Sequence, residues 1–237
     1  MPPAEPAAAG RAAPGSATLL LIPTELERER LLDRGGLPPG LAQVECCGFG
    51  PVVAAARTAE LCARLRPARV LLVGIAGAYD VARHPPGSAA EFAAVALDGV
   101  GVGRGRDFLP PPALGFPQWP GSAGADGEAR GAAPILERLE LAAPAGAPAL
   151  APLLLTTCAA SACQVEADER RARFPAAAAE DMEGFAVASA CALAGVRLRI
   201  VRGISNRVGD REAGRWRIPA ALAEARLLAL EILASWT

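Results

Sequence analysis

The feature that most constrains the fold of this chain is a regular alternation of short apolar runs with helix-like segments. The run ARVLLVGIAGA (68–78) has the continuous apolar character of a strand buried on both faces, and it enters a glycine turn. It follows an alanine-rich segment, PVVAAARTAELCARL (51–65), which is typical of a helix that ends before Pro67. Because buried strands separated by helices usually lie parallel, the alternation predicts an α/β fold with a largely parallel central sheet.

The other expected elements continue this order along the chain. Gly195 is a helix stop signal, and the segment 103–133 is so rich in proline and glycine that we expect a long loop of the kind that borders binding sites. Further strands are expected at 17–23, 41–47, 91–101, 152–157 and 197–203, and further helices at 164–173, 184–194 and 218–236.

Length and charge limit the classes of function. The chain has 237 residues, a formal net charge of -1 and a pI near 6.0, so it has no basic surplus that favours nucleic acid as a partner. No apolar run approaches the ~20 residues that span a bilayer, so we expect no membrane partner. Residues 1–17 lack the apolar core of a signal peptide and are expected to be a disordered leader. We therefore expect a single cytoplasmic domain over 18–237 that acts on a small molecule.

Metal and cofactor chemistry are not indicated. The only histidine, His84, precedes two prolines and is interpreted as a structural loop residue. The six cysteines show no C-x-x-C spacing and are expected to be buried, reduced thiols. We expect neither a metal nor a cofactor. The cysteines are Cys46, Cys47, Cys62, Cys158, Cys163 and Cys191.

Polar and glycine-rich segments stand at the expected carboxyl ends of three strands. They are PTELE (23–27), GIAGA (74–78) and the pair at 205–206, while Met182-Glu183 precedes a helix. Open α/β sheets bind ligands at this edge, so these four segments are expected to form one pocket. Taken alone, TELE also fits a helix N-cap with an acidic first turn, and GIAGA fits a simple turn without the GxGxxG spacing.

The ordered motifs together resemble the family of purine nucleosidases and nucleoside phosphorylases that includes the methylthioadenosine and adenosylhomocysteine nucleosidases. Within it, the chain is most similar to the futalosine hydrolase family, through "RGISNRVGDREAGRWRIPAAL" above all. The resemblance covers residues 18–236 and implies a three-layer α/β/α sandwich around a mixed central sheet, assembled as a homo-oligomer. The other segments on which the resemblance rests are PTELERERLL, CGFGPVVAAA, VLLVGIAGA, FLPPPALGF and EDMEG with MEGFAVASACALAGV.

The resemblance implies an N-glycosyl hydrolase that releases hypoxanthine from futalosine in menaquinone biosynthesis, with methylthioadenosine/adenosylhomocysteine nucleosidase as the alternative. It assigns Glu183 to the ribose hydroxyls, packs Met182 against the sugar, and assigns Glu27 to the attacking water. Glu25 and Glu29 remain competitors for the role of Glu27.

Position 206 carries asparagine where the adenine-specific relatives carry aspartate. An amide is able to donate to the O6 atom of a 6-oxopurine and to accept a proton carried on N7, so Asn206 is expected to favour hypoxanthine. A turn-capping asparagine is the alternative. Because Ala160 and Ser161 are small where those relatives have an aromatic residue, Phe49 or the 103–133 loop is expected to stack on the base. The other implied substrate-binding residues are Ala76, Gly77, Asp181 and Ser205.

Water is the expected nucleophile. A phosphorylase needs an anion site, but PTELE offers glutamates and GIAGA has no hydroxyl. A nucleoside-binding protein without activity is a second hypothesis, which the presence of Glu27 disfavours.

Overall fold

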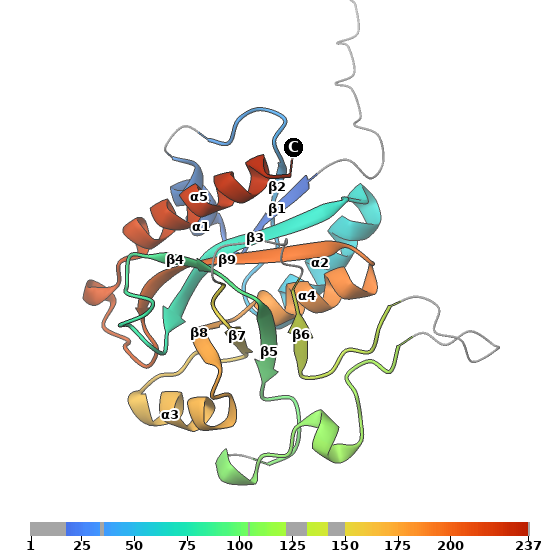
Figure 1. The fold of residues 1–237 in the computed structure, drawn as a ribbon, viewed down its shortest axis with the longest axis vertical. Helices are drawn as coiled ribbons and strands as arrows, with labels where there is room; N and C mark the ends of the chain where they lie inside the picture. The colour runs from blue at the N-terminus through green and yellow to red at the C-terminus, as the bar shows by residue number, and fades with distance from the viewer. Residues whose placement is uncertain (1–17, 34–35, 104, 122–131, 142–149, 237) are drawn as a thin grey trace, which may run out of the picture.

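Nine strands form one sheet in the computed structural model of the chain, within the residues that it describes (Figure 1). Those residues are 18–33, 36–103, 105–121, 132–141 and 150–236. The expected leader and part of the 103–133 loop lie outside them. The strands are β1 (Thr18–Ile22), β2 (Gln43–Cys46), β3 (Arg69–Ala78), β4 (Ala89–Glu91), β5 (Ala94–Asp98), β6 (Arg138–Glu140), β7 (Leu153–Thr157), β8 (Ala177–Asp181) and β9 (Arg197–Arg207).

Four of the five α-helices among these residues confirm the expected helical segments, and the remaining one, which begins at Glu25, agrees with the alternative interpretation of TELE as a helix N-cap. Thr24 and Glu27 form a capping box at the start of the first helix, and Pro51 occupies the first turn of the second, where its missing N–H is not needed. The described part of the 103–133 segment holds only short 3₁₀ turns and isolated bridges, as expected of a loop. The helices are α1 (Glu25–Leu32), α2 (Pro51–Leu65), α3 (Gln164–Arg173), α4 (Gly184–Leu193) and α5 (Ile218–Ala234).

The sheet is mixed and is organised around β3. This strand runs parallel to β1 and β9, and it meets the antiparallel β8 only through Gly77 and Ala78 at its carboxyl end. Five described strand pairs are parallel and three are antiparallel. The mixed sheet expected from the resemblance is therefore confirmed.

Helices cover both faces of the sheet. Figure 1 shows α1 and α5 on one side of β3 and β9, with α2 and α4 on the other. Alternate residues of the strands enter different cores because successive side chains point to opposite faces. Leu71 packs in the core beneath α5, whereas Leu72 packs in the core that includes Leu61 of α2 and Val187 of α4. None of the described helices combines the length and apolar character needed to cross a bilayer.

Four strand expectations need correction. The expected strand 91–101 is shorter, because β5 covers only Ala94–Asp98, and Glu91 belongs to the separate strand β4, which pairs with a different partner. The last strand continues to Arg207 instead of ending at 203, because its pairing with β3 persists past a register shift. Strands β6 and β8 were not expected. The β8 sequence, AAAED, has few residues that favour strands, and its pairing with β3 and β7 forms it.

A buried ion pair joins β4 to β9. Glu91 accepts hydrogen bonds from the guanidinium of Arg199, including one of 2.7 Å from Nη2 to Oε2. Both side chains are at most 7% exposed. The ring of Trp236 lies 5.6 Å from the guanidinium carbon. Removing one partner of such a pair leaves an uncompensated buried charge.

Glu91→Ala is therefore expected to lower the free energy of unfolding by about 3–5 kcal/mol, measured by chemical denaturation. Glu140→Ala is the matched control, because Glu140 pairs with Arg138 at 2.6 Å on the exposed surface. The control is expected to change stability by less than about 1 kcal/mol. Equal effects in the two variants would contradict this account of the Glu91 pair.

Candidate active site

One cavity of about 250 Å³ lies where β3, β8 and β9 end and where α1 and α4 begin. β3 and β9 are parallel, and β8 overlaps only the end of β3, so the carboxyl ends of all three strands meet here. Every residue that the sequence indicated as catalytic or substrate-binding lines the cavity: Glu27, Phe49, Ala76, Gly77, Ala160, Ser161, Asp181, Met182, Glu183, Ser205 and Asn206.

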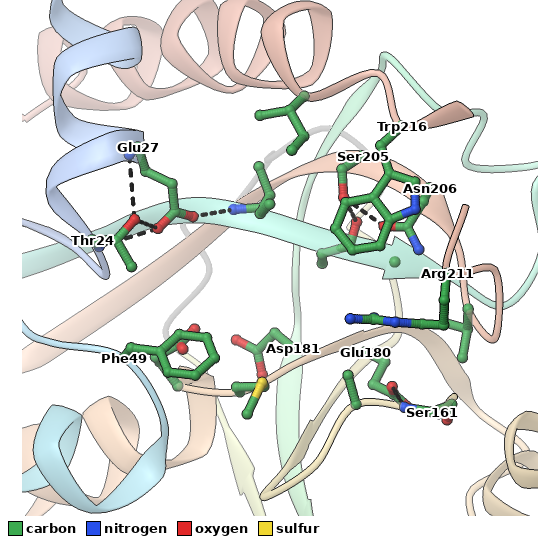
Figure 2. A pocket seen from close by; sticks show the side chains of 18 of the residues that line it. Thr24, Glu27, Phe49, Ser161, Glu180, Asp181, Ser205, Asn206, Arg211 and Trp216 are labelled. Atoms are coloured by element: carbon green, nitrogen blue, oxygen red, sulfur yellow. Dashed lines mark hydrogen bonds between the residues drawn. The ribbon is translucent and has the colours of Figure 1, made fainter. Parts of the chain in front are cut away.

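Glu27 is held rigidly at one end of the cavity (Figure 2). Its Oε2 accepts hydrogen bonds from the Thr24 backbone N–H at 3.1 Å and from the Thr24 hydroxyl at 2.6 Å. Its Oε1 accepts from the backbone N–H of Ile75 at 2.9 Å. Glu27 is thus both a helix-capping residue and a cavity residue. Its two competitors, Glu25 and Glu29, are exposed and do not line the cavity.

Glu183 is a second buried carboxylate of this site. Its Oε1 accepts a hydrogen bond of 3.0 Å from the Gly50 N–H, and its Oε2 lies 3.4 Å from Nη2 of Arg202. Burial raises the pKa of Glu183 to about 7, although the positive charge of Arg202 and the Gly50 N–H act in the opposite direction. Gly50 has a φ of 80°, a conformation that glycine adopts without strain.

Arg202, which the sequence interpretation missed, links the two acidic segments. It is fully buried on β9, and its Nε donates a hydrogen bond of 3.0 Å to Asp181. Asp181 also accepts from the Gly184 N–H and the Thr156 hydroxyl, so both of its oxygens are occupied and it acts as a positioning residue. The signal was an arginine inside an apolar strand, RIVRGIS.

The other guanidinium nitrogen of Arg202, Nη1, has no hydrogen-bond partner among the described residues. It lies beside Gly74. A Cβ atom at this position would collide with Nη1 of Arg202 and would lie 2.9 Å from Oε1 of Glu27. The absence of a side chain at Gly74 therefore leaves Arg202 and Glu27 flanking the same spot. A buried donor beside a carboxylate is suited to hold a small polar molecule such as water.

Asn206 lies at the opposite end of the cavity, inside β9 and not after it. Its Nδ2 donates to the backbone carbonyls of Arg207 at 2.7 Å and Asp210 at 3.3 Å. Its Oδ1 accepts a hydrogen bond of 2.7 Å from the Ser205 hydroxyl. These partners determine the orientation of the amide, so its nitrogen is not free to donate to a ligand in this rotamer.

The wall near Ser161 is held by a second buried network. Glu180 accepts hydrogen bonds of 2.7 Å from the Ser161 N–H, the Ser161 hydroxyl and the Tyr79 hydroxyl. Arg170 contributes a further contact of 3.2 Å to Glu180 and bonds to the carbonyl of Ala159. Burial, together with the charge of Glu180, raises the pKa of Tyr79. The network leaves Ser161 and Glu180 with little capacity to bind a ligand directly.

Two further cavity residues, Arg211 and Trp216, belong to the segment after β9 and were not indicated individually by the sequence. The guanidinium carbon of Arg211 lies 4.9 Å from the centre of the Trp216 ring, a cation–π geometry. The other candidate aromatic residue, Phe49, is 66% exposed at the Glu27 end. No described residue of the 103–133 loop lines the cavity. The described residues include no group of three or more His, Cys, Asp or Glu side chains placed to bind a metal ion.

Comparisons with known proteins agree with this architecture. The model of the phosphorylase superfamily matches residues 40–235. A futalosine hydrolase of Streptomyces coelicolor is 35% identical over 187 residues, which cover 74% of this chain and 72% of that protein. A futalosine hydrolase of Acidothermus cellulolyticus is 40% identical over 106 residues, which span 44% of this chain and 43% of that relative.

The chain belongs to the futalosine hydrolase family, within the phosphorylase superfamily. Two solved structures show the same fold. The futalosine hydrolase of Helicobacter pylori matches with a TM-score of 0.68 and 16% identity, over 92% of this chain and 97% of that one. A 5'-methylthioadenosine/S-adenosylhomocysteine nucleosidase of Neisseria meningitidis matches with a TM-score of 0.68 and 18% identity, over 92% and 99%. The family and fold expected from the sequence are confirmed.

In this member of the futalosine hydrolase family, the raised pKa of Glu183 links stability to pH. Its folded-state value of about 7 is above the ordinary value of 4.5, so folding favours the protonated form. The cost of ionising the buried group is absent well below pH 4.5 and reaches its full size above pH 7. Glu183→Gln removes this cost, so the variant is expected to be stabilised relative to the unmodified protein. The difference in unfolding free energy, variant minus unmodified protein, is expected to be about 2–3 kcal/mol larger at pH 8 than at pH 5.

Urea denaturation of both proteins at the two pH values measures this difference. Glu169→Gln, on the exposed surface of α3, is the control for removing a carboxylate. If the difference in unfolding free energy between Glu183→Gln and the unmodified protein does not change with pH, Glu183 ionises equally easily in the folded and unfolded states.

Proposed function

We propose that this chain hydrolyses the N-ribosidic bond of futalosine, releasing hypoxanthine and dehypoxanthine futalosine in menaquinone biosynthesis. The observation that carries the proposal is the convergence of two buried carboxylates, Glu27 and Glu183, on one cavity in a member of the futalosine hydrolase family. Cleavage of such a bond passes through a ribose ring with developing positive charge. Two carboxylates near that ring stabilise the charge and bind its polar substituents.

Glu183 is assigned to the ribose hydroxyls. Its Oε1 and Oε2 each have one contact with the protein, to Gly50 and Arg202, which leaves acceptor capacity for the 2'- and 3'-hydroxyls. The ionised form is the one that accepts two such bonds and stabilises positive charge on the sugar. Met182, which lines the cavity beside it, supplies an apolar contact for the ring.

Glu27 and Arg202 are assigned to the attacking water. Three hydrogen bonds hold the Glu27 carboxylate, and one acceptor site remains on Oε1. Water placed between this oxygen and the unpaired Nη1 of Arg202 would give one proton to Glu27 as its oxygen attacks C1'. The C1'–N9 electron pair goes to the purine, which takes up a proton, so the overall reaction adds one water and releases the neutral base.

Phosphate is disfavoured as the nucleophile. The described residues that line the cavity include four carboxylates, Glu27, Glu180, Asp181 and Glu183, and the one cation that lines it, Arg211, lies at the far end from Glu27 (Figure 2). A phosphate anion beside Glu27 would meet the like charge of Glu27 and Glu183, and the single unpaired donor of Arg202 is fewer than the several donors that a phosphate requires.

We also propose that the protein acts in the cytoplasm as a homo-oligomer. Three apolar side chains close to the cavity, those of Leu26, Phe49 and Val52, are 53–80% exposed. Apolar side chains grouped at a cavity edge are typical of a surface that another protein covers. A second copy of this chain is the proposed partner, so the edge near Phe49 would be completed by the assembly.

The proposed reaction predicts that the purified protein releases hypoxanthine from futalosine without added phosphate. Liquid chromatography measures the free base, with inosine and methylthioadenosine as comparison substrates and each reaction repeated with phosphate. Turnover of futalosine that exceeds both comparisons and does not respond to phosphate is the expected result. Release of adenine from methylthioadenosine at a higher rate, or strict dependence on phosphate, would replace the proposal with one of its alternatives.

Glu27→Gln is expected to lower kcat and kcat/KM together by at least ~100-fold, because the amide no longer accepts the proton of water in the transition state. Steady-state kinetics with futalosine measure the effect. Glu29→Gln, which changes an exposed glutamate of the same helix, is the matched control and is expected to retain normal turnover. Near-normal kcat in Glu27→Gln, in a protein that still binds nucleoside, would assign water activation to another group.

A further inference from the structure

Asn206 has no free hydrogen-bond donor for the substituent at the purine 6-position. Its Nδ2 already donates to the carbonyls of Arg207 and Asp210, and only its Oδ1 has remaining acceptor capacity. An amide oxygen only accepts hydrogen bonds, so it offers no donor to a 6-oxo group or to an unprotonated N7. A second side chain at the same end of the cavity must therefore supply the donor.

Arg211 lies at that end. Figure 2 shows its side chain extending into the cavity between Asn206 and Trp216 on one side and Glu180 and Ser161 on the other. The Asp210 carbonyl accepts hydrogen bonds from Asn206 and from Nε1 of Trp216 at 3.1 Å. This shared carbonyl anchors the backbone next to Arg211, and the Trp216 ring supports its guanidinium at 4.9 Å.

The positive charge of Arg211 is not neutralised within the described part of the chain. None of the described carboxylates forms an ion pair with it. Glu180, the carboxylate drawn closest to it in Figure 2, is already bound by Tyr79, Ser161 and Arg170. The guanidinium therefore keeps its donors available for a ligand.

We propose that Arg211 is the residue that selects a 6-oxopurine, by donating to O6 and N7 of hypoxanthine, and that it stabilises the base as it departs. This inference rests on the proposed function. A 6-oxopurine presents two adjacent acceptors, O6 and N7, which match the two parallel N–H groups of a guanidinium. A 6-aminopurine presents an amino donor in place of O6, so the same guanidinium opposes it.

The same contact acts on the chemical step. When the C1'–N9 bond breaks, its electron pair enters the purine and the negative charge spreads to N7 and O6. Asn206 has no acidic proton to neutralise this charge, whereas the guanidinium of Arg211 stabilises it until the base takes up a proton from solvent. Arg211 is thus expected to affect kcat as well as the choice of base.

The experiment compares kcat/KM for futalosine and for its 6-amino analogue in the unmodified protein, Arg211→Gln and Arg211→Lys. A bidentate contact to a base discriminates by about 1–3 kcal/mol, so Arg211→Gln is expected to lower the ratio of the two values roughly 10- to 100-fold. Arg211→Lys keeps the charge without the planar fork and is expected to give an intermediate ratio. The matched control is Arg215→Gln, because Arg215 is an exposed arginine of the same segment that pairs with Glu212 at 2.9 Å and does not line the cavity.

Calorimetric binding of free hypoxanthine and adenine to the same four proteins gives a readout that does not need turnover. Weaker hypoxanthine binding in Arg211→Gln, with adenine binding that is unchanged or tighter and a normal Arg215→Gln control, supports the proposal. An unchanged ratio of kcat/KM or unchanged hypoxanthine binding overturns it. If the unmodified protein binds hypoxanthine through Arg211 but does not cleave futalosine, the proposed function fails while the base assignment stands.

Discussion

The site depends on one buried guanidinium. Arg202 is completely enclosed on β9, where an unpaired charge would be strongly destabilising, so the acidic groups that face it are a condition for folding. Asp181 provides the main compensation, and it simultaneously bonds to the Gly184 N–H at the start of α4. The same interaction that neutralises Arg202 therefore sets the direction of α4 and places Glu183 in the cavity wall.

This arrangement explains why the two carboxylates of Glu183 and Asp181, two positions apart, have different roles. Both oxygens of Asp181 are occupied by protein donors, whereas each oxygen of Glu183 has a single contact. Burial raises the pKa of Glu183 to about 7, while Arg202 opposes the shift. The fold thus keeps one acid as a structural counter-charge and leaves the other with free acceptor capacity in the cavity wall.

The two ends of the cavity differ in the charge that protein partners leave free, because Glu180, at the Arg211 end, is bound by Tyr79, Ser161 and Arg170. Glu27 lies at the end proposed to bind the ribose, and Arg211 lies near Asn206 at the end proposed to bind the base (Figure 2). Glu183 also lines the cavity, close enough to Glu27 for their charges to interact. This polarity matches the charge separation of N-ribosidic cleavage, in which the sugar becomes positive while the base becomes negative. The proposed direction of substrate binding follows from that match.

The sequence by itself determined the alternating α/β order, four of the five described helices and eleven of the residues that line the cavity. Local patterns of apolar and capping residues predict the strands and helices, and the motifs that resemble a known family identify the cavity residues. It did not determine β8, whose AAAED segment forms a strand only by pairing with β3 and β7. Tertiary structure alone decided that β9 continues through Asn206 and that its amide nitrogen is occupied. It also decided that Arg202 is buried beside Asp181 and Glu183 and that Arg211 has no acidic partner among the described residues, because ion pairing depends on segments far apart in the chain.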